Sequence, residues 1–103
     1  MSEDKLFQEI REIDRVIHEP ARLAIMAALY TVREADFRYL LSITGLTKGN
    51  LSAHASKLEE SGYIEVEKKF VHKKPMTIYR LTDKGRQAFS EYLRVIKEVA
   101  KLK

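Results

Sequence analysis

The sequence predicts an α+β fold that is mostly α, and three observations lead to it. Apolar residues recur at helical spacing in five segments, at residues 3–18, 20–30, 36–43, 47–62 and 83–102. Between the last two segments the period changes from 3.6 to 2, which predicts a β-hairpin within residues 63–82. Two of the helical segments are short and are separated by a turn that contains Gly45. The pattern fits one domain over residues 1–103.

Composition limits the classes of function. A chain of 103 residues with 45% hydrophobic and 33% charged residues is typical of a globular domain with a modest core. The net charge of +4 favours a polyanionic partner. The absence of cysteine excludes disulfides, thiol catalysis and thiolate metal sites. No segment has the pattern of a signal peptide or a membrane span, so we expect a cytoplasmic protein without membrane contact. Many Lys and Glu residues with few Asn and Gln are typical of a thermophilic source.

The first two helical segments are expected to lie in different environments. Residues 3–18 carry an apolar stripe that includes Leu6 and Ile17, opposite a charged face. Pro20 then fits the first turn of the next helix, where its missing N–H group costs nothing. Residues 20–30 are apolar nearly all round, which predicts a position at the centre of the core.

Residues 36–62 have the spacing of a helix-turn-helix motif. Asp36 can cap the first helix, Gly45 can end it, and Thr47 can cap the second helix. Two short helices joined by a turn with glycine are typical of this motif, although a helical hairpin without a function has the same spacing.

The second helix of the motif, residues 47–62, has an unusual outer face. Leu51, Ala55 and Leu58 fall on the side that should face the core, whereas the opposite side is mostly small or able to form hydrogen bonds. Small side chains let a helix approach a flat partner, and Ser, Asn and Lys can bond to base edges and phosphates. The pattern predicts a helix that lies in the major groove of DNA; the alternative is a plain amphipathic helix.

The predicted hairpin has a basic tip. Its turn is expected at residues 71–75, between strands that end near Val71 and begin at Met76. This tip can lie along a phosphate backbone or reach the minor groove, and the alternative is a solvated turn. The wing residues proposed to contact DNA are Lys68, Lys69, His72, Lys73, Lys74 and Arg80.

The terminal helices predict a homodimer. Thr82 can cap the last helix, which carries a long apolar stripe comparable to that of the first helix. A domain this small cannot easily bury both stripes, and an uncovered one would be an unusually large patch. We therefore expect residues 1–18 and 83–103 to form a two-fold dimer interface, the alternative being a monomer that buries both stripes itself. The predicted interface residues are Leu6, Phe7, Ile10, Ile13, Phe89, Tyr92, Leu93, Ile96 and Val99.

Three stretches, at residues 14–25, 46–63 and 79–86, resemble the winged helix-turn-helix transcriptional regulators of the MarR/ArsR-like group, and within it the compact winged-helix DNA-binding domain family. Their sequences are DRVIHEPARLAI, LTKGNLSAHASKLEESGY and YRLTDKGR. The likeness covers nearly the whole chain. It implies a two-stranded β-wing and sequence-specific binding of duplex DNA by a homodimer. By position, the resemblance implies a DNA-facing set made of Thr47, Lys48, Gly49, Asn50, Ser52, Ala53 and His54, to which the helical wheel adds Ser56 and Lys57.

The sequence departs from the family pattern at two positions. Ala53 stands where such regulators commonly have a basic residue, which weakens the expected sequence discrimination. Ala55 stands where they commonly have a large apolar residue, which thins the packing under the helix. The three histidines are scattered and no cysteine is present, so no metal and no cofactor is expected.

The predicted function is a transcriptional regulator, with repression favoured over activation. Catalysis is not expected, because the sequence has no nucleophile with base and acid partners and no phosphate-binding loop. Two alternatives stay open: a protein-interaction module, which the basic tip disfavours, and an architectural DNA binder of low specificity, which Ala53 favours. An apolar dimer interface could hold a small-molecule effector, but no residue pattern supports one.

Overall fold

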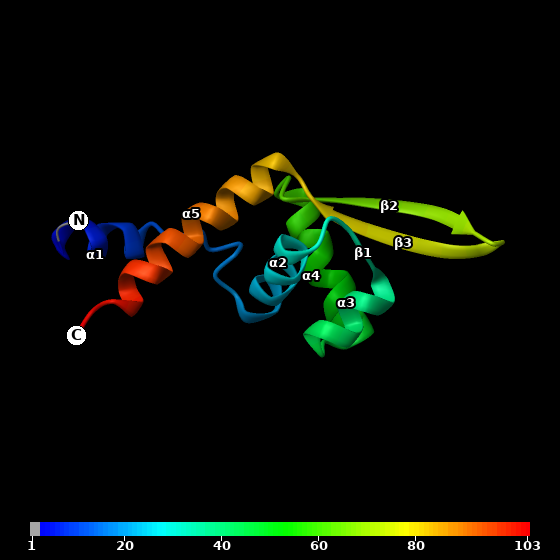
Figure 1. The fold of residues 1–103 in the computed structure, drawn as a ribbon, viewed down its shortest axis with the longest axis horizontal. Helices are drawn as coiled ribbons and strands as arrows, with labels where there is room; N and C mark the ends of the chain where they lie inside the picture. Colours follow the sequence, from blue (N-terminus) through cyan, green and yellow to red (C-terminus); the bar gives the residue numbers. More distant parts are fainter. Residues whose placement is uncertain (1–2) are drawn as a thin grey trace.

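The computed structural model describes residues 3–103, which form five helices and a three-stranded sheet. Figure 1 shows a helical body in the middle, a long hairpin on one side, and the two terminal helices on the other. The predicted α+β fold, mostly helical with a β-wing, is confirmed. The helices are α1 (Glu3–Arg11), α2 (Pro20–Thr31), α3 (Phe37–Thr44), α4 (Lys48–Glu60) and α5 (Asp83–Ala100). The strands are β1 (Ala35–Asp36), β2 (Ile64–Val71) and β3 (Lys74–Leu81).

The first helix is shorter than predicted. α1 ends at Arg11, whereas the predicted helical segment ran to residue 18. Residues 1 and 2 of the predicted dimer segment lie outside the described residues. The Asp14 carboxylate accepts hydrogen bonds from the backbone N–H groups of Val16 (2.9 Å) and Ile17 (3.1 Å), which bends the chain into a turn. Ile17 is nevertheless fully buried. The apolar spacing continued past the end of the helix because this loop also faces the core.

The core is centred on α2, as predicted. Glu19 caps this helix by accepting from the backbone N–H of Arg22 at 2.7 Å, and Pro20 occupies its first turn. Ile25, Met26 and Leu29 are buried at 0 to 1% exposure. They pack in one cluster with buried residues of α3, α4, β3 and α5. The cluster fixes α4 relative to the hairpin.

The sheet has one strand more than predicted. Its order is β1-β3-β2, with all pairs antiparallel, and β1 pairs with β3 through Ala35↔Tyr79 and Asp36↔Ile78. The predicted hairpin corresponds to β2 and β3, whereas β1 lies between the second and third helical segments, where no strand was predicted. A two-residue strand is too short to show a period of 2. Asp36 also caps α3, accepting from the backbone N–H of Tyr39 at 2.7 Å, and this role was the one visible in the sequence.

The hairpin turn is tighter than predicted. Val71 pairs with Lys74, so the turn consists of His72 and Lys73 alone and does not span residues 71–75. Both residues have positive φ angles, 52° and 67°. Pro75 fits within β3 because β1 pairs only with Ile78 and Tyr79 in the described chain, which leaves this part of β3 without a neighbour on that side.

The terminal helices contact each other within one chain. Arg94 of α5 forms ion pairs with Glu9 of α1 and with Glu91 one turn away. α5 begins at its predicted cap, where Thr82 accepts from the backbone N–H of Gly85 at 2.9 Å, and it ends at Ala100, two residues earlier than expected. The radius of gyration is 15.4 Å, whereas a compact chain of this length has about 13 Å. The molecule is therefore elongated, with these two helices at one end (Figure 1).

Candidate nucleic-acid interface

Helix α4 presents a small, polar face to the outside. Thr47 caps it by accepting from the backbone N–H of Asn50 at 3.1 Å. Leu51, Ala55 and Leu58 are buried at 0 to 2% exposure, as the helical wheel predicted. The exposed residues of its outer face include Lys48, Gly49, Asn50, Ser52, Ala53, Ser56 and Lys57.

Gly49 has no structural reason to be glycine within this chain. A Cβ atom built on it would meet nothing within 4 Å, and the backbone there is ordinary helix. Glycine within a helix costs up to about 1 kcal/mol relative to alanine. Glycine at this position therefore relieves no contact inside the protein. Its missing side chain would instead let the surface of another molecule come close to the helix backbone.

His54 is half-buried and is held in a small network. Its Nδ1 atom lies 3.2 Å from the Arg22 guanidinium and 3.7 Å from the Glu19 carboxylate. The Arg22 guanidinium also donates to the Val16 carbonyl at 2.6 Å. Because an arginine only donates, this Nδ1 accepts and the remaining ring N–H is on Nε2. Arg22 thus ties α4 to the loop between α1 and α2, a role that the sequence pattern does not indicate.

The wing is anchored by a tight junction with α5. The Thr82 hydroxyl donates to the Gly62 carbonyl at 2.6 Å, and the Thr82 N–H donates to the Tyr63 carbonyl at 3.0 Å. Gly62 has a φ of 79°, the left-handed conformation in which helices commonly end. A Cβ atom on Gly85 would lie 2.0 Å from the Tyr63 carbonyl oxygen. Only glycine lets the first turn of α5 approach the base of the wing so closely.

Tyr63 joins the base of the wing to the loop after α1. Its hydroxyl donates a hydrogen bond to the carboxylate of Asp14, and Lys84 lies over its ring at 5.6 Å. Burial and the hydrogen bond to Asp14 raise the pKa of Tyr63 to about 12. The carboxylate of Asp14 thus bonds both to the wing base and to the backbone of its own loop.

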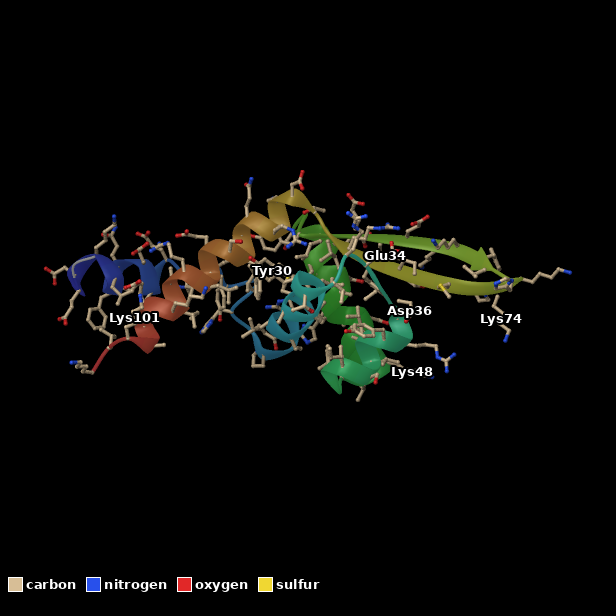
Figure 2. All side chains as sticks on the ribbon, viewed as in Figure 1. Tyr30, Glu34, Asp36, Lys48, Lys74 and Lys101 are labelled. Carbon is tan, nitrogen blue, oxygen red and sulfur yellow. The ribbon has the colours of Figure 1, made fainter. Side chains whose placement is uncertain are left out.

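The net positive charge of the protein comes from the wing. Residues 68–77 contain four of the 19 Lys and Arg residues and none of the 15 Asp and Glu residues, so the rest of the chain has 15 of each sign. Lys68, Lys69, His72, Lys73 and Lys74 are all exposed. Figure 2 shows Lys74 near the far end of the hairpin.

Arg80 differs from the other predicted wing residues. It lies near the base of β3, and its guanidinium forms ion pairs at 2.8 Å with Glu34 and Glu67. Hydrogen bonding to Glu67 raises the pKa of Arg80 further above its usual value. Its charge is already paired within the chain, so it is a positioning residue for the wing and a poor candidate for a phosphate contact.

The outer face of α4 and the wing meet across a shallow hollow of about 250 Å³. Ser52, Ser56 and Glu59 line it from the helix, and Lys68 and Thr77 line it from the two strands. These four hydroxyl and ammonium groups can donate hydrogen bonds to one phosphate backbone. Thr77 was not predicted, because its position opposite Lys68 follows from the strand register.

Some predicted dimer residues are covered by their own chain. Leu6, Phe89 and Tyr92 are 2 to 4% exposed and belong to the protomer's interior, although they were predicted to face a partner. Phe7 is 55% exposed. An open groove of about 820 Å³ lies between α1, the following loop and α5, and its apolar lining comes from Ile10, Ile13, Ile96 and Val99. Leu93 is partly buried and packs against the core.

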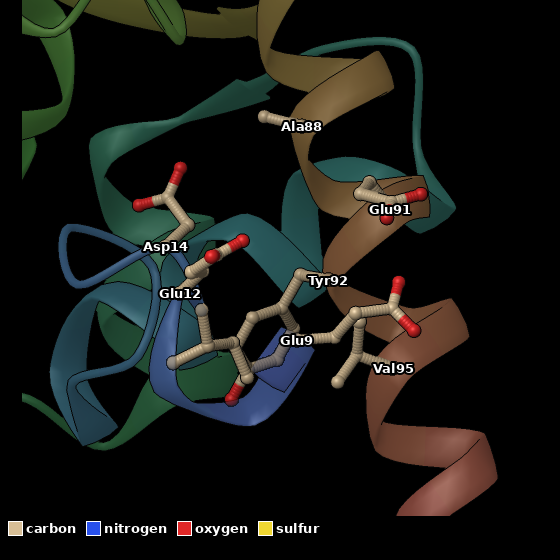
Figure 3. Close-up of a pocket in the computed structure, with 8 residues that line it drawn as sticks. Glu9, Glu12, Asp14, Ala88, Glu91, Tyr92 and Val95 are labelled. Atoms are coloured by element: carbon tan, nitrogen blue, oxygen red, sulfur yellow. The ribbon is translucent and has the colours of Figure 1, made fainter. Parts of the chain in front are cut away.

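A second hollow, of about 330 Å³, lies between the end of α1 and α5 (Figure 3). Its rim carries the carboxylates of Glu9, Glu12, Asp14 and Glu91. Hydrogen bonding to Arg94 lowers the pKa of Glu91. Among residues 3–103 no three His, Asp or Glu side chains are placed so that they could hold a metal ion, and these carboxylates are no exception. No described helix is long and apolar enough to cross a membrane.

The sequence of this chain matches a known protein family and a curated relative. A family model described as winged helix DNA-binding domain matches residues 21–100. An uncharacterised protein of Methanocaldococcus jannaschii is 37% identical over 87 residues, which cover 84% of this chain and 95% of that protein. Its source is a thermophilic archaeon, in keeping with the composition.

Solved structures of transcriptional regulators share this fold. A transcriptional regulator homologue from Pyrococcus horikoshii is 32% identical with a TM-score of 0.84, over 90% of this chain and 94% of that one. The homodimeric winged helix-turn-helix domain of a possible ArsR-family regulator from Mycobacterium bovis has the same fold, with 19% identity and a TM-score of 0.71 over 98% of this chain and 92% of that one. MarR-family regulators are also among the structural neighbours. The chain therefore belongs to the winged helix DNA-binding domain family of transcriptional regulators.

Proposed function

We propose that this protein binds specific sequences of double-stranded DNA as a homodimer and represses transcription. The observation that carries the proposal is that the small, polar face of α4 and the basic wing border one hollow, lined by Ser52, Ser56, Lys68 and Thr77. Each α4 would enter a major groove, with Asn50 and Ser52 toward base edges and Lys48 and Lys57 toward phosphates. The wing lysines would contact the backbone beside it.

The dimer is supported by the shape of the protomer. The groove between α1 and α5 leaves Ile10, Ile13, Ile96 and Val99 at an open apolar surface, at one end of an elongated molecule. Apolar surface of this kind is stabilised by a partner, and the Mycobacterium bovis relative is homodimeric. A two-fold pair would place its two α4 helices on half-sites about one helical turn, roughly 10 base pairs, apart or a little more.

Repression follows from the arrangement with the fewest parts. Repression by occupancy needs only the proposed dimer surface and the proposed DNA surface, both of which lie within the described residues. A protein that covers about two turns of a promoter excludes polymerase by occupancy alone.

The test is selection from a random pool of duplexes at near-physiological salt, followed by sequencing of the bound fraction. Enrichment of an inverted repeat is the expected result. Retention without a motif would favour an architectural binder, for which Ala53, exposed and without a polar group, is the specific observation. Absence of retention would contradict DNA binding by the unliganded protein.

The dimer is tested separately by sedimentation equilibrium. Val99→Glu places a charge in the apolar groove and should yield monomers, whereas Lys97→Glu, at an exposed position two residues away, should leave the dimer intact. A wild-type protein that sediments as a monomer at micromolar concentration would contradict the dimer.

A further inference from the structure

The most exposed large apolar side chain of the described residues lies on the wing. Phe70 is 77% exposed, against 41 to 55% for Phe7, Tyr39, Ile43 and Leu102. It is the second residue before the two-residue turn, and Pro75 stands directly opposite it in the register of β2 and β3. The described core does not use this ring. An aromatic ring this exposed is a candidate for contact with another molecule.

The side of the wing on which Phe70 lies follows from strand geometry. Alternate residues of a strand point to the same face. On β2 this face carries Ile64, which is buried, then Val66 and Lys68, which line the hollow shared with Ser52 and Ser56 of α4. Phe70 continues the row beyond the helix. It therefore faces the side on which DNA would lie against α4, two residues beyond Lys68.

The charge around Phe70 selects its partner. Residues 68–77 hold four lysines, one histidine and no acidic residue. A partner must be strongly anionic and must also offer apolar surface to the ring. Duplex DNA meets both conditions at its minor groove, where deoxyribose and base edges lie between two rows of phosphates.

The wing tip is also shaped in advance. His72 and Lys73 both have the positive φ angles of the tight hairpin turn that matches strand twist, a turn that usually contains glycine or asparagine. Pro75 fixes the backbone angle of the residue opposite Phe70. A rigid tip loses little freedom when it enters a groove, so the ring is held ready for contact.

We propose that Phe70 is a DNA-contacting residue that enters the minor groove next to the site bound by α4 and packs its ring against sugars and base edges there. This inference rests on the proposed DNA-binding function. An apolar side chain inserted in the minor groove partly unstacks a base-pair step. The steps that unstack most easily are the flexible pyrimidine–purine steps, such as TA and CA. Phe70 thus adds a sequence preference outside the bases that α4 reaches.

The chain contains no tryptophan, so a single introduced tryptophan reports on its own position. Phe70→Trp is to be compared with Val71→Trp, its neighbour on the opposite face of the strand. Each variant is titrated with a duplex of about 30 base pairs carrying the enriched sequence, long enough for both half-sites and their flanks. The fluorescence of Phe70→Trp should be quenched and protected from acrylamide on binding, and that of Val71→Trp should not.

A second pair of variants separates an apolar contact from a charged one. Phe70→Ala should weaken binding by about tenfold at every salt concentration, because the apolar contact between the ring and the groove is lost. The slope of log K against log salt should stay unchanged, because no charge is removed. Lys68→Ala should reduce that slope by about 0.9, the value for one phosphate contact. In a repeated pool selection, Phe70→Ala should lose any preference for pyrimidine–purine steps at the flanks.

The outcomes distinguish this inference from the function on which it rests. If labelled duplex is bound but both tryptophans respond alike, or Phe70→Ala binds as tightly as wild type, Phe70 does not enter the groove and the proposed function stands. If Phe70→Ala changes only the sedimentation of the free protein, the ring contacts a second copy and the inference is overturned. If wild type binds no duplex, both proposals fail together.

Discussion

The Tyr63 hydroxyl donates a hydrogen bond to the Asp14 carboxylate, although 49 residues separate them in the chain. The same carboxylate organises the turn after α1 through the N–H groups of Val16 and Ile17. The base of the wing is therefore fixed to the loop that borders the proposed dimer groove. Three hydrogen bonds to one carboxylate thus connect the two proposed surfaces.

Replacement of Tyr63 by phenylalanine tests this contact. Burial first, and the hydrogen bond to Asp14 second, raise the folded-state pKa of Tyr63 from 10.0 to about 12. The stability that the neutral tyrosine contributes is therefore fully present below pH 10 and is lost as the pH rises from 10 through 12. Tyr63→Phe should lower the free energy of unfolding by about 1 kcal/mol at neutral pH. Urea unfolding at several pH values is the measurement. The difference between variant and wild type should shrink above pH 10; a constant difference would contradict the assignment.

Gly85 and Gly49 should respond oppositely to alanine. At Gly85 the new Cβ would clash with the Tyr63 carbonyl, so the helix and the wing base must separate, at a cost of about 3 kcal/mol or more. At Gly49 the methyl group meets nothing within 4 Å, and stability should stay the same or rise by at most about 1 kcal/mol. Thermal unfolding of the two variants provides the comparison. An unfolding midpoint of Gly85→Ala equal to that of wild type would show that the junction can open.

Lys73→Gly should stabilise the free protein. The left-handed conformation costs a non-glycine residue about 1 kcal/mol, and glycine removes this cost. Lys74→Gly is the matched control. It removes the same charge from a residue paired in the strand, and glycine there should destabilise by a few tenths of a kcal/mol to about 1 kcal/mol. Thermal melting distinguishes the two, and equal shifts would mean that the turn is unstrained.

Asn50→Ala and Lys74→Ala should weaken DNA binding in different ways. Loss of a good contact from Asn50 to a base edge should reduce the free-energy difference between the preferred base and the other bases at one position by about 1–3 kcal/mol. Loss of the Lys74 charge should weaken all duplexes nearly equally and make the salt slope shallower by about 0.9. Competition binding with single-base variants of the enriched duplex measures both. If Asn50→Ala lowers only the overall affinity, Asn50 does not read a base.

The parts of the fold that were predicted correctly depend on short-range signals. The caps at Asp36, Thr47 and Thr82 each accept from an N–H group three residues on, and such spacing is visible in the sequence. Strand β1 is visible only through its pairing with Tyr79 and Ile78, more than 40 residues away. The same limit applies within the candidate site. Arg80 looks like a free wing cation until Glu34 is seen beside it.

The uneven distribution of charge has a consequence for how the protein meets its target. All of the formal net charge lies in ten residues near one end of a molecule 56 Å long, while the remainder is balanced. The excess of positive charge on each protomer is therefore concentrated on its wing. If the protein binds DNA as proposed, this concentration of charge favours encounters in which a wing faces the polyanion, and the encounter rate should fall as the ionic strength rises.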